Sequence, residues 1–186
     1  MKIGSLLLAF FLFVRLSDGQ LINVDSLRRQ IELLPDDTSK VLLLGTLSGY
    51  YNNNHLDSGF YLVRRMITLS QKLNYPYGEA LELSILATSD DRTGDMAKSL
   101  QISLNCLHQS EKLTYGKDEM DCRAYTQIGL VNFLTGHYND ARMYLHRALF
   151  YAKKFYPDET SYYQIYAHLG NAFRREGLFD SSEYYT

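Results

Sequence analysis

Proline is scarce in this sequence: its 186 residues contain only Pro35, Pro76 and Pro157. Runs in which Val, Ile or Thr alternate with polar residues are also missing. Because proline interrupts helices and such alternation is typical of half-buried strands, both absences favour an all-α chain. The hydrophobic content of 46% is that of an ordinary globular protein and argues against disorder.

Long apolar runs are absent as well, apart from residues 3–14. This run of about a dozen residues is too short for a membrane span of about 20. Lys2 precedes it and Ser17-Asp18-Gly19 follows it, which is the pattern of a secretory signal. We predict a signal peptide at residues 1–19 and an exported, periplasmic or extracytoplasmic protein. The alternative is an uncleaved anchor, against which Arg15 argues.

Charge of one sign is not in excess. Cleavage would remove Lys2, Arg15 and Asp18 from 19 basic and 21 acidic residues, which leaves 17 and 20 and a net charge of −3. This balance lacks the basic excess that binding to nucleic acid requires, so we expect no nucleic-acid partner for this segment.

The motifs of catalysis are missing. There is neither a G-x-G-x-x-G nor a G-x-x-x-x-G-K-[ST] sequence, and no two of the five histidines stand at metal-binding spacing. We therefore predict no catalytic site, no cofactor and no metal in this segment. Cys106 and Cys122 remain open: export permits a disulfide, but their helical positions favour two free thiols that pack as small hydrophobic groups.

A repeat of about 41 residues is the main positive signal. Gly129 and Gly136 recur 41 residues later as Gly170 and Gly177. Gly94 precedes Gly136 by 42 residues, and Asn54 precedes Gly94 by 40. We interpret Asn54 as a substitute for the turn glycine, because asparagine tolerates a left-handed backbone.

Each unit is predicted to be a pair of antiparallel helices. In the third unit these are about residues 120–134 and 138–154. Tyr138, Ala141, Leu145 and Ala148 lie on one face of the second helix. We expect small residues and turn glycines to allow close packing within and between the units: Gly94, Gly129, Gly136, Ala141, Ala148, Gly170 and Gly177.

This pattern resembles the tetratricopeptide repeat (TPR) family. The third unit matches its motif at Tyr125, Ile128, Gly129, Gly136 and Tyr138, as well as at the two alanines of its second helix. The resemblance implies an all-α solenoid and covers residues 40–186 in units of about 40–79, 80–121, 122–162 and 163–186, the last truncated. Residues 20–39 are predicted to hold a leading helix that covers the first unit.

The resemblance also implies a binding groove lined by the first helix of each pair. Its candidate residues are Tyr51, Thr88, Arg123, Thr126, Phe133, Asn171 and Arg174. Leu44, Ser48, Ser84, Asp91, Leu130 and Gln164 fall at equivalent positions. Such a mixture of hydroxyl, amide, guanidinium and aromatic groups suits an extended peptide or protein partner.

Together with the signal sequence, the long period resembles exported repeat regions that precede a membrane span and a histidine kinase or a DNA-binding regulator in Bacteroidetes-type bacteria. The resemblance implies a sensor fragment whose membrane anchor and kinase domain lie beyond residue 186. The fourth unit stops early in its second helix, which also suggests a fragment. The alternative is a free-standing exported TPR scaffold that assembles envelope complexes.

Overall fold

The computed structural model describes residues 23–156 and 162–185, and the regular elements in these ranges are nine α-helices. They are α2 (Val24–Leu33), α3 (Thr38–Asn54), α4 (Leu56–Lys72), α5 (Pro76–Thr93), α6 (Met96–Ser110), α7 (Lys117–Leu134), α8 (Tyr138–Phe155), α9 (Tyr163–Arg175) and α10 (Phe179–Glu183). The predicted signal peptide lies outside the described residues.

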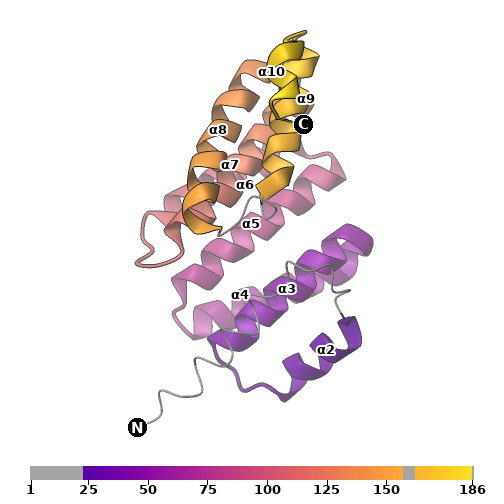
Figure 1. Cartoon of the computed structure of the whole chain (residues 1–186). Helices are drawn as coiled ribbons and strands as arrows, with labels where there is room; N and C mark the ends of the chain where they lie inside the picture. The colour runs from indigo at the N-terminus through magenta and orange to yellow at the C-terminus, as the bar shows by residue number, and fades with distance from the viewer. Residues whose placement is uncertain (1–22, 157–161, 186) are drawn as a thin grey trace.

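Consecutive helices pack in pairs, which are α3 with α4, α5 with α6, α7 with α8 and α9 with α10. Figure 1 shows the pairs stacked in chain order, with α2 at one end and α10 at the other. The prediction of an all-α stack of antiparallel helix pairs is confirmed. The first helices α3, α5, α7 and α9 also contact one another in series, whereas successive second helices within the described residues do not pack extensively on one another. The first helices therefore lie on the inner side of the stack.

Glycine ends the first helix in three of the four pairs. Gly94, Gly136 and Gly177 have φ angles of 87°, 84° and 77°, which favour glycine because it has no Cβ. The residue after each glycine donates its N–H to a carbonyl five residues back, as His137 does to Asn132 at 2.8 Å. This is the hydrogen bond of a Schellman motif, and it turns the chain into the second helix.

The first pair does not have this turn, so the prediction for Asn54 is wrong. Asn54 is the last residue of α3, and only His55 separates α3 from α4. The His55 N–H bonds to the Tyr51 carbonyl, and His55 itself has an extended φ of −149°. The asparagine with a left-handed backbone is instead Asn74, with φ of 48°, in the connection from α4 to α5.

Small residues bring the two helices of a pair together. A Cβ added to Gly129 would lie 2.7 Å from Leu145 Cγ and 3.3 Å from the Ala141 carbonyl oxygen. In the second and fourth pairs, serine stands at the position of Ala141 and donates a hydrogen bond across the pair. Ser99 bonds to the Ala87 carbonyl at 2.8 Å, and Ser182 bonds to the Gly170 carbonyl at 2.9 Å. These serines therefore satisfy a helix carbonyl without widening the pair.

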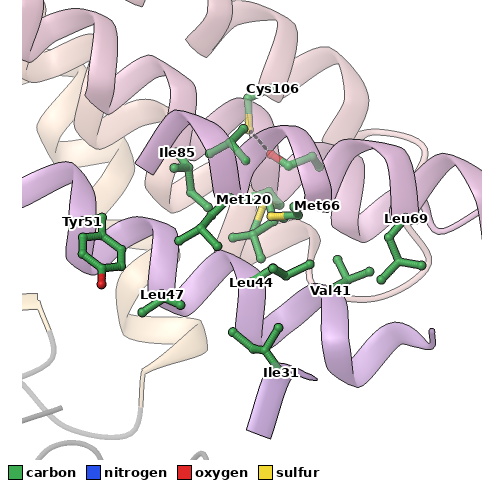
Figure 2. Packing of buried hydrophobic residues seen from close by; sticks show 14 of the residues in the cluster. Ile31, Val41, Leu44, Leu47, Tyr51, Met66, Leu69, Ile85, Cys106 and Met120 are labelled. Atoms are coloured by element: carbon green, nitrogen blue, oxygen red, sulfur yellow. Dashed lines mark hydrogen bonds between the residues drawn. The ribbon is translucent and has the colours of Figure 1, made fainter. Parts of the chain in front are cut away.

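The hydrophobic core runs through the stack as two clusters. Figure 2 shows the first, in which side chains from α2 to α7 meet around Leu44 and Met66. The second cluster joins α7, α8 and α9 around Leu145 and Leu169, both fully buried. Both clusters contain residues of α7, so this helix connects the two halves of the stack.

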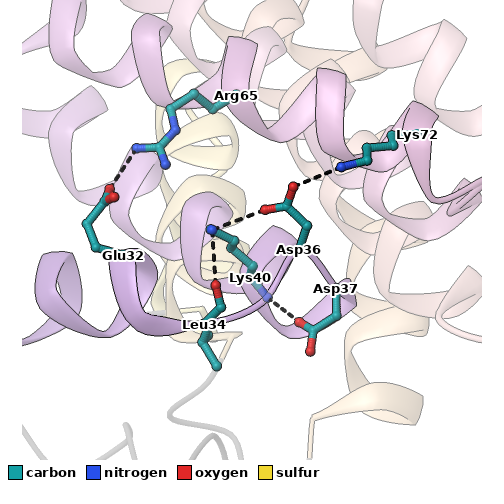
Figure 3. A network of polar contacts seen from close by, with 7 residues as sticks. All are labelled: Glu32, Leu34, Asp36, Asp37, Lys40, Arg65 and Lys72. Carbon is teal, nitrogen blue, oxygen red and sulfur yellow. Dashed lines mark hydrogen bonds and ion pairs between the residues drawn. The ribbon is translucent and has the colours of Figure 1, made fainter.

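Helix α2 covers the first pair. Asn23 caps it by accepting a hydrogen bond from the Ser26 N–H at 2.9 Å, and its Ile31 is 1% exposed against the first core cluster. Figure 3 shows the polar contacts that hold its end. Arg65 of α4 pairs with Glu32 at 3.2 Å, and Asp36, which follows α2, pairs with Lys40 and Lys72 at 3.1 and 3.0 Å.

Candidate functional site

The inner side of the stack presents a row of partly exposed side chains from three first helices. We call it the inner row, and its members are Thr88 and Asp91 of α5, Arg123, Thr126, Leu130 and Phe133 of α7, and Gln164, Asn171 and Arg174 of α9. On α7 the contrast with the neighbouring face is sharp, because Ala124, Ile128 and Val131 are at most 3% exposed. The structure thus leaves accessible the predicted groove residues of α5, α7 and α9, except Ser84, which is buried.

Arg123 is the best-positioned cation of the inner row. Glu119, one helical turn earlier, accepts hydrogen bonds from it at 2.8 and 3.0 Å. Tyr77 of α5 donates to the other oxygen of that carboxylate at 2.5 Å. The Arg123 side chain nevertheless stays 41% exposed. Its guanidinium is therefore held in place and still has N–H groups for an incoming carboxylate or carbonyl.

The two threonines present acceptors. Thr88 donates its hydroxyl proton to the Ser84 carbonyl at 3.1 Å, and Thr126 donates to the Cys122 carbonyl at 2.8 Å. With their protons engaged inside the helices, both hydroxyl oxygens can accept hydrogen bonds from outside. Asp91 is partly exposed and adds a carboxylate to the row, although its Oδ1 is buried and has no hydrogen-bond partner among the described residues.

The Asp91 carboxylate of α5 acts electrostatically on His168 of α9. Burial lowers the pKa of His168, and the nearby Asp91 carboxylate opposes this shift. Because the usual pKa of histidine is already below 7, this net lowering keeps His168 mostly neutral near pH 7.

In the first pair the predicted groove residues are not accessible. Tyr51 is 6% exposed, and Leu44 and Ser48 are 1% and 0% exposed. The residues 80 positions later in the third pair, Val131, Ala124 and Ile128, are buried in the same way. The first pair therefore matches the third at a spacing of 80 residues, whereas the predicted groove assumed a spacing of 82.

The physical reason is the connection between α3 and α4, which is two residues shorter than that between α7 and α8. The corrected register places Leu43, Thr46 and Tyr50 on the inner side, and all three are partly exposed. Tyr51 instead lies under Arg28 of α2, whose guanidinium carbon is 5.3 Å from the ring centroid.

Two pockets lie away from the inner row. The larger, of about 510 Å³, is an open pocket lined by residues of α2, α3 and α4, among them the apolar Ile31, Leu47 and Leu62 and the basic Arg28 and Arg65. The second, of about 410 Å³, lies between α7 and α8 and is lined by Tyr125, His146, Arg147, Phe150 and Tyr151.

Both cysteines are buried and free. Burial raises the pKa of Cys106 to about 12 and that of Cys122 to about 11, so both thiols stay protonated at neutral pH. Within the ranges that the structure describes, no three His, Cys, Asp or Glu side chains cluster to hold a metal ion. No helix in those ranges is both long and apolar enough to cross a bilayer.

Neither a family model nor a curated protein matches this sequence. Solved structures do. BtubC (BKLC) from P. vanneervenii superposes with a TM-score of 0.63 at 16% identity over 87% of this chain, which spans just under two thirds (66%) of BtubC. Two structures of MamA give TM-scores of 0.50 at 15% and 16% identity, again over 87% of this chain and over 81% and 76% of theirs.

The fold is TPR-like. At identities this low, the superpositions establish only the arrangement of the helices. That arrangement confirms the fold that the repeat pattern predicts.

The predicted groove residues do not include the aromatic and basic side chains of α8 at and beside the α7–α8 pocket. Met143, Arg147, Phe150 and Lys154 follow one another at helical spacing on α8. That spacing, together with the 16 tyrosines, was the available signal.

Proposed function

We propose that this TPR-like chain is a scaffold that binds an extended peptide segment of a partner protein along the inner row. The observation that supports it is the row itself, which crosses α5, α7 and α9. It combines a guanidinium group fixed by a carboxylate, hydroxyl oxygens that can accept hydrogen bonds, and apolar side chains. A hydrophobic core alone does not require exposed polar groups at equivalent positions of successive helices. We propose no catalytic activity for this segment.

The side chains of the inner row indicate which chemical groups a ligand should carry. Arg123 and Arg174 suit a carboxylate or backbone carbonyls, whereas Thr126 and Asp91 suit backbone N–H groups or a basic side chain. Leu130 and Phe133 of α7 are partly exposed and offer a place for one apolar side chain. The best ligand is therefore an extended segment with an apolar residue flanked by polar ones.

Selection of peptides from a random display library on the purified chain tests this proposal. We expect selected peptides to bind with Kd values on the order of micromolar. Arg123→Ala and Asn171→Ala should each weaken binding about 5- to 10-fold, because each removes one hydrogen-bonding side chain. Asn105→Ala, an exposed change on the second helix α6, is the matched control and should leave Kd unchanged. Equal losses in all three variants would contradict an inner-row site.

We also propose that the protein is exported. The support is the apolar run at residues 3–14 with its flanking residues, which lie outside the described ranges. Fusion of residues 1–30 to alkaline phosphatase, an enzyme active only after export, tests it. Activity that disappears when Leu8 is changed to Arg is the expected result, and an inactive fusion would refute export.

The sensor role stays a proposal supported by the sequence resemblance alone. In the sensor hypothesis, binding of a partner to the scaffold changes the activity of a kinase or regulator domain. That domain is connected to the scaffold by a membrane anchor beyond residue 186. Its alternative is a free-standing exported scaffold. The genomic sequence that follows residue 186 decides between them: an apolar span of about 20 residues and a kinase motif favour the sensor, and an early stop codon refutes it.

A further inference from the structure

The outer side of the third pair carries a cluster of aromatic rings, and basic side chains lie over the faces of these rings. We call it the α8 patch and define it as Tyr125, Tyr144, Arg147, Phe150, Tyr151 and Lys154. The ring of Tyr125 stacks between Tyr144 and Tyr151, with centroids 6.2 and 5.7 Å away and interplanar angles of 20° and 13°. The rings of Phe150 and Tyr151 pack edge to face, with their centroids 5.2 Å apart. These contacts make the rings a rigid surface.

Two cations lie over these rings. The Arg147 guanidinium carbon is 5.7 Å from the Tyr125 centroid and 5.9 Å from that of Tyr144. The Lys154 ammonium is 4.4 Å from the Phe150 centroid and 5.4 Å from that of Tyr151. The rings thus fix where both positive charges stand.

Neither charge is paired with a carboxylate in the part of the chain that the structure describes. Among the described residues, no Asp or Glu oxygen lies within 4.0 Å of Arg147 or Lys154. The Asp121 carboxylate on α7 is already bound by Lys117 at 2.5 Å. Within the described ranges the patch therefore presents two positive charges without a paired carboxylate, and these complement a negatively charged partner.

Packing of the fold does not require the most exposed apolar side chains of α8. The second helices align at their first residues, Leu56, Met96 and Tyr138, so positions 143 and 150 of α8 correspond to Gln101 and His108 of α6. Polar residues thus suffice where α8 has Met143 and Phe150, and these are 43% and 58% exposed. Large exposed apolar side chains that packing does not require mark a contact surface.

We propose that the α8 patch is a second docking surface, which binds an acidic segment of a partner protein through one apolar side chain flanked by carboxylates. The apolar side chain enters the pocket of about 410 Å³ beside Tyr125 and Phe150. The flanking carboxylates pair with Arg147 and Lys154 on either side of it. Rigid aromatic rings and arginine are the side chains that contribute most to protein interfaces. This surface is on the outer side of the stack and is independent of the inner row.

Fluorescence anisotropy with the full purified chain tests the proposal. The probe is a labelled octapeptide with Phe-Leu at its centre and Asp or Glu at all other positions. Two comparison peptides replace either the acidic residues by Lys or the central pair by Ser-Ser. Binding of the acidic probe should exceed that of both comparison peptides about 10-fold or more, and it should weaken as salt rises from 0.05 to 0.5 M because the charges are screened.

Variants locate the site. Arg147→Glu combined with Lys154→Glu should weaken probe binding about 10-fold or more, and Phe150→Ser about 5-fold. Arg64→Glu is the control, because Arg64 is an exposed residue at the outward position of α4 that corresponds to His146. It should change Kd less than about 2-fold. All four residues are exposed, so unchanged circular dichroism will show that the variants fold.

Several results would overturn the proposal. Equal weakening by Arg64→Glu would mean general attraction to a polyanion. Equal binding of the Ser-Ser peptide would mean a simple anion site without an apolar anchor. Binding to vesicles of anionic phospholipid, lost in the Arg147 and Lys154 variant, without binding to the probe would make the patch a membrane contact instead.

Discussion

Replacing Gly129 with alanine should destabilise the protein, although alanine is the better helix former. The exchange gains about 1 kcal/mol of helix propensity. Against this, the new Cβ would lie 2.7 Å from Leu145 Cγ and 3.0 Å from its Cδ2. Leu145 is fully buried, so its branch point cannot move away without displacing α8 from α7. Overpacking of this kind costs about 1–3 kcal/mol or more. We expect a net loss of about 1–2 kcal/mol.

Gly49 provides the matched control. It is also a helical glycine in a first helix, but a Cβ added there meets no atom within 4 Å. Gly49→Ala should therefore gain about 0.5–1 kcal/mol. Thermal unfolding followed by circular dichroism should show the midpoint falling by a few degrees for Gly129→Ala and rising for Gly49→Ala. A Gly129→Ala midpoint at or above that of wild type would refute the packing argument.

Three further predictions follow from polar or ionisable groups that are buried or partly buried. Ser99→Ala should cost about 1–3 kcal/mol in urea unfolding, because Gln127 donates to its hydroxyl at 3.1 Å and would lose that buried partner. Burial, reinforced by a neighbouring carboxylate, raises the pKa of Glu82 to about 7, so the folded state binds the proton more tightly and stability is lost as pH rises from about 4.5 to 7. Glu82→Gln should thus be about 1–2 kcal/mol more stable than wild type at pH 8 and equal to it at pH 4, allowing for partial solvent screening; equal stability at both values would exclude the shift. Cys106 and Cys122 should react with Ellman's reagent only in denaturant, and rapid reaction of the native protein would contradict their burial.

The turns were the most predictable part of the fold. Gly94, Gly136 and Gly177 adopt a backbone that few other residues tolerate, so their spacing alone indicated where each pair turns. The first pair was less predictable. Its single-residue connection at His55 has no glycine to mark it, and the two-residue shift moved the predicted face of α3 into the core.

The candidate sites depended on contacts between helices, and sequence patterns record these only in part. Ser99 and Ser182 looked like departures from the repeat, yet each bonds across its pair to the helix carbonyl twelve residues before it. The α8 patch depends on the ring of Tyr125 from α7 lying between two tyrosines of α8. Helical spacing could place those residues on faces, but only the packing of the pair brings the faces together.

Photo-crosslinking tests the inner-row site most directly. A benzophenone amino acid is placed at Thr126, on the inner row of α7, or at Asn105, on the outer side of α6, and the chain is irradiated with a selected peptide bound. We predict a crosslink from position 126 that excess unlabelled peptide abolishes, and none from position 105. A crosslink from position 105 alone, or equal crosslinking from both, would contradict peptide binding along the inner row.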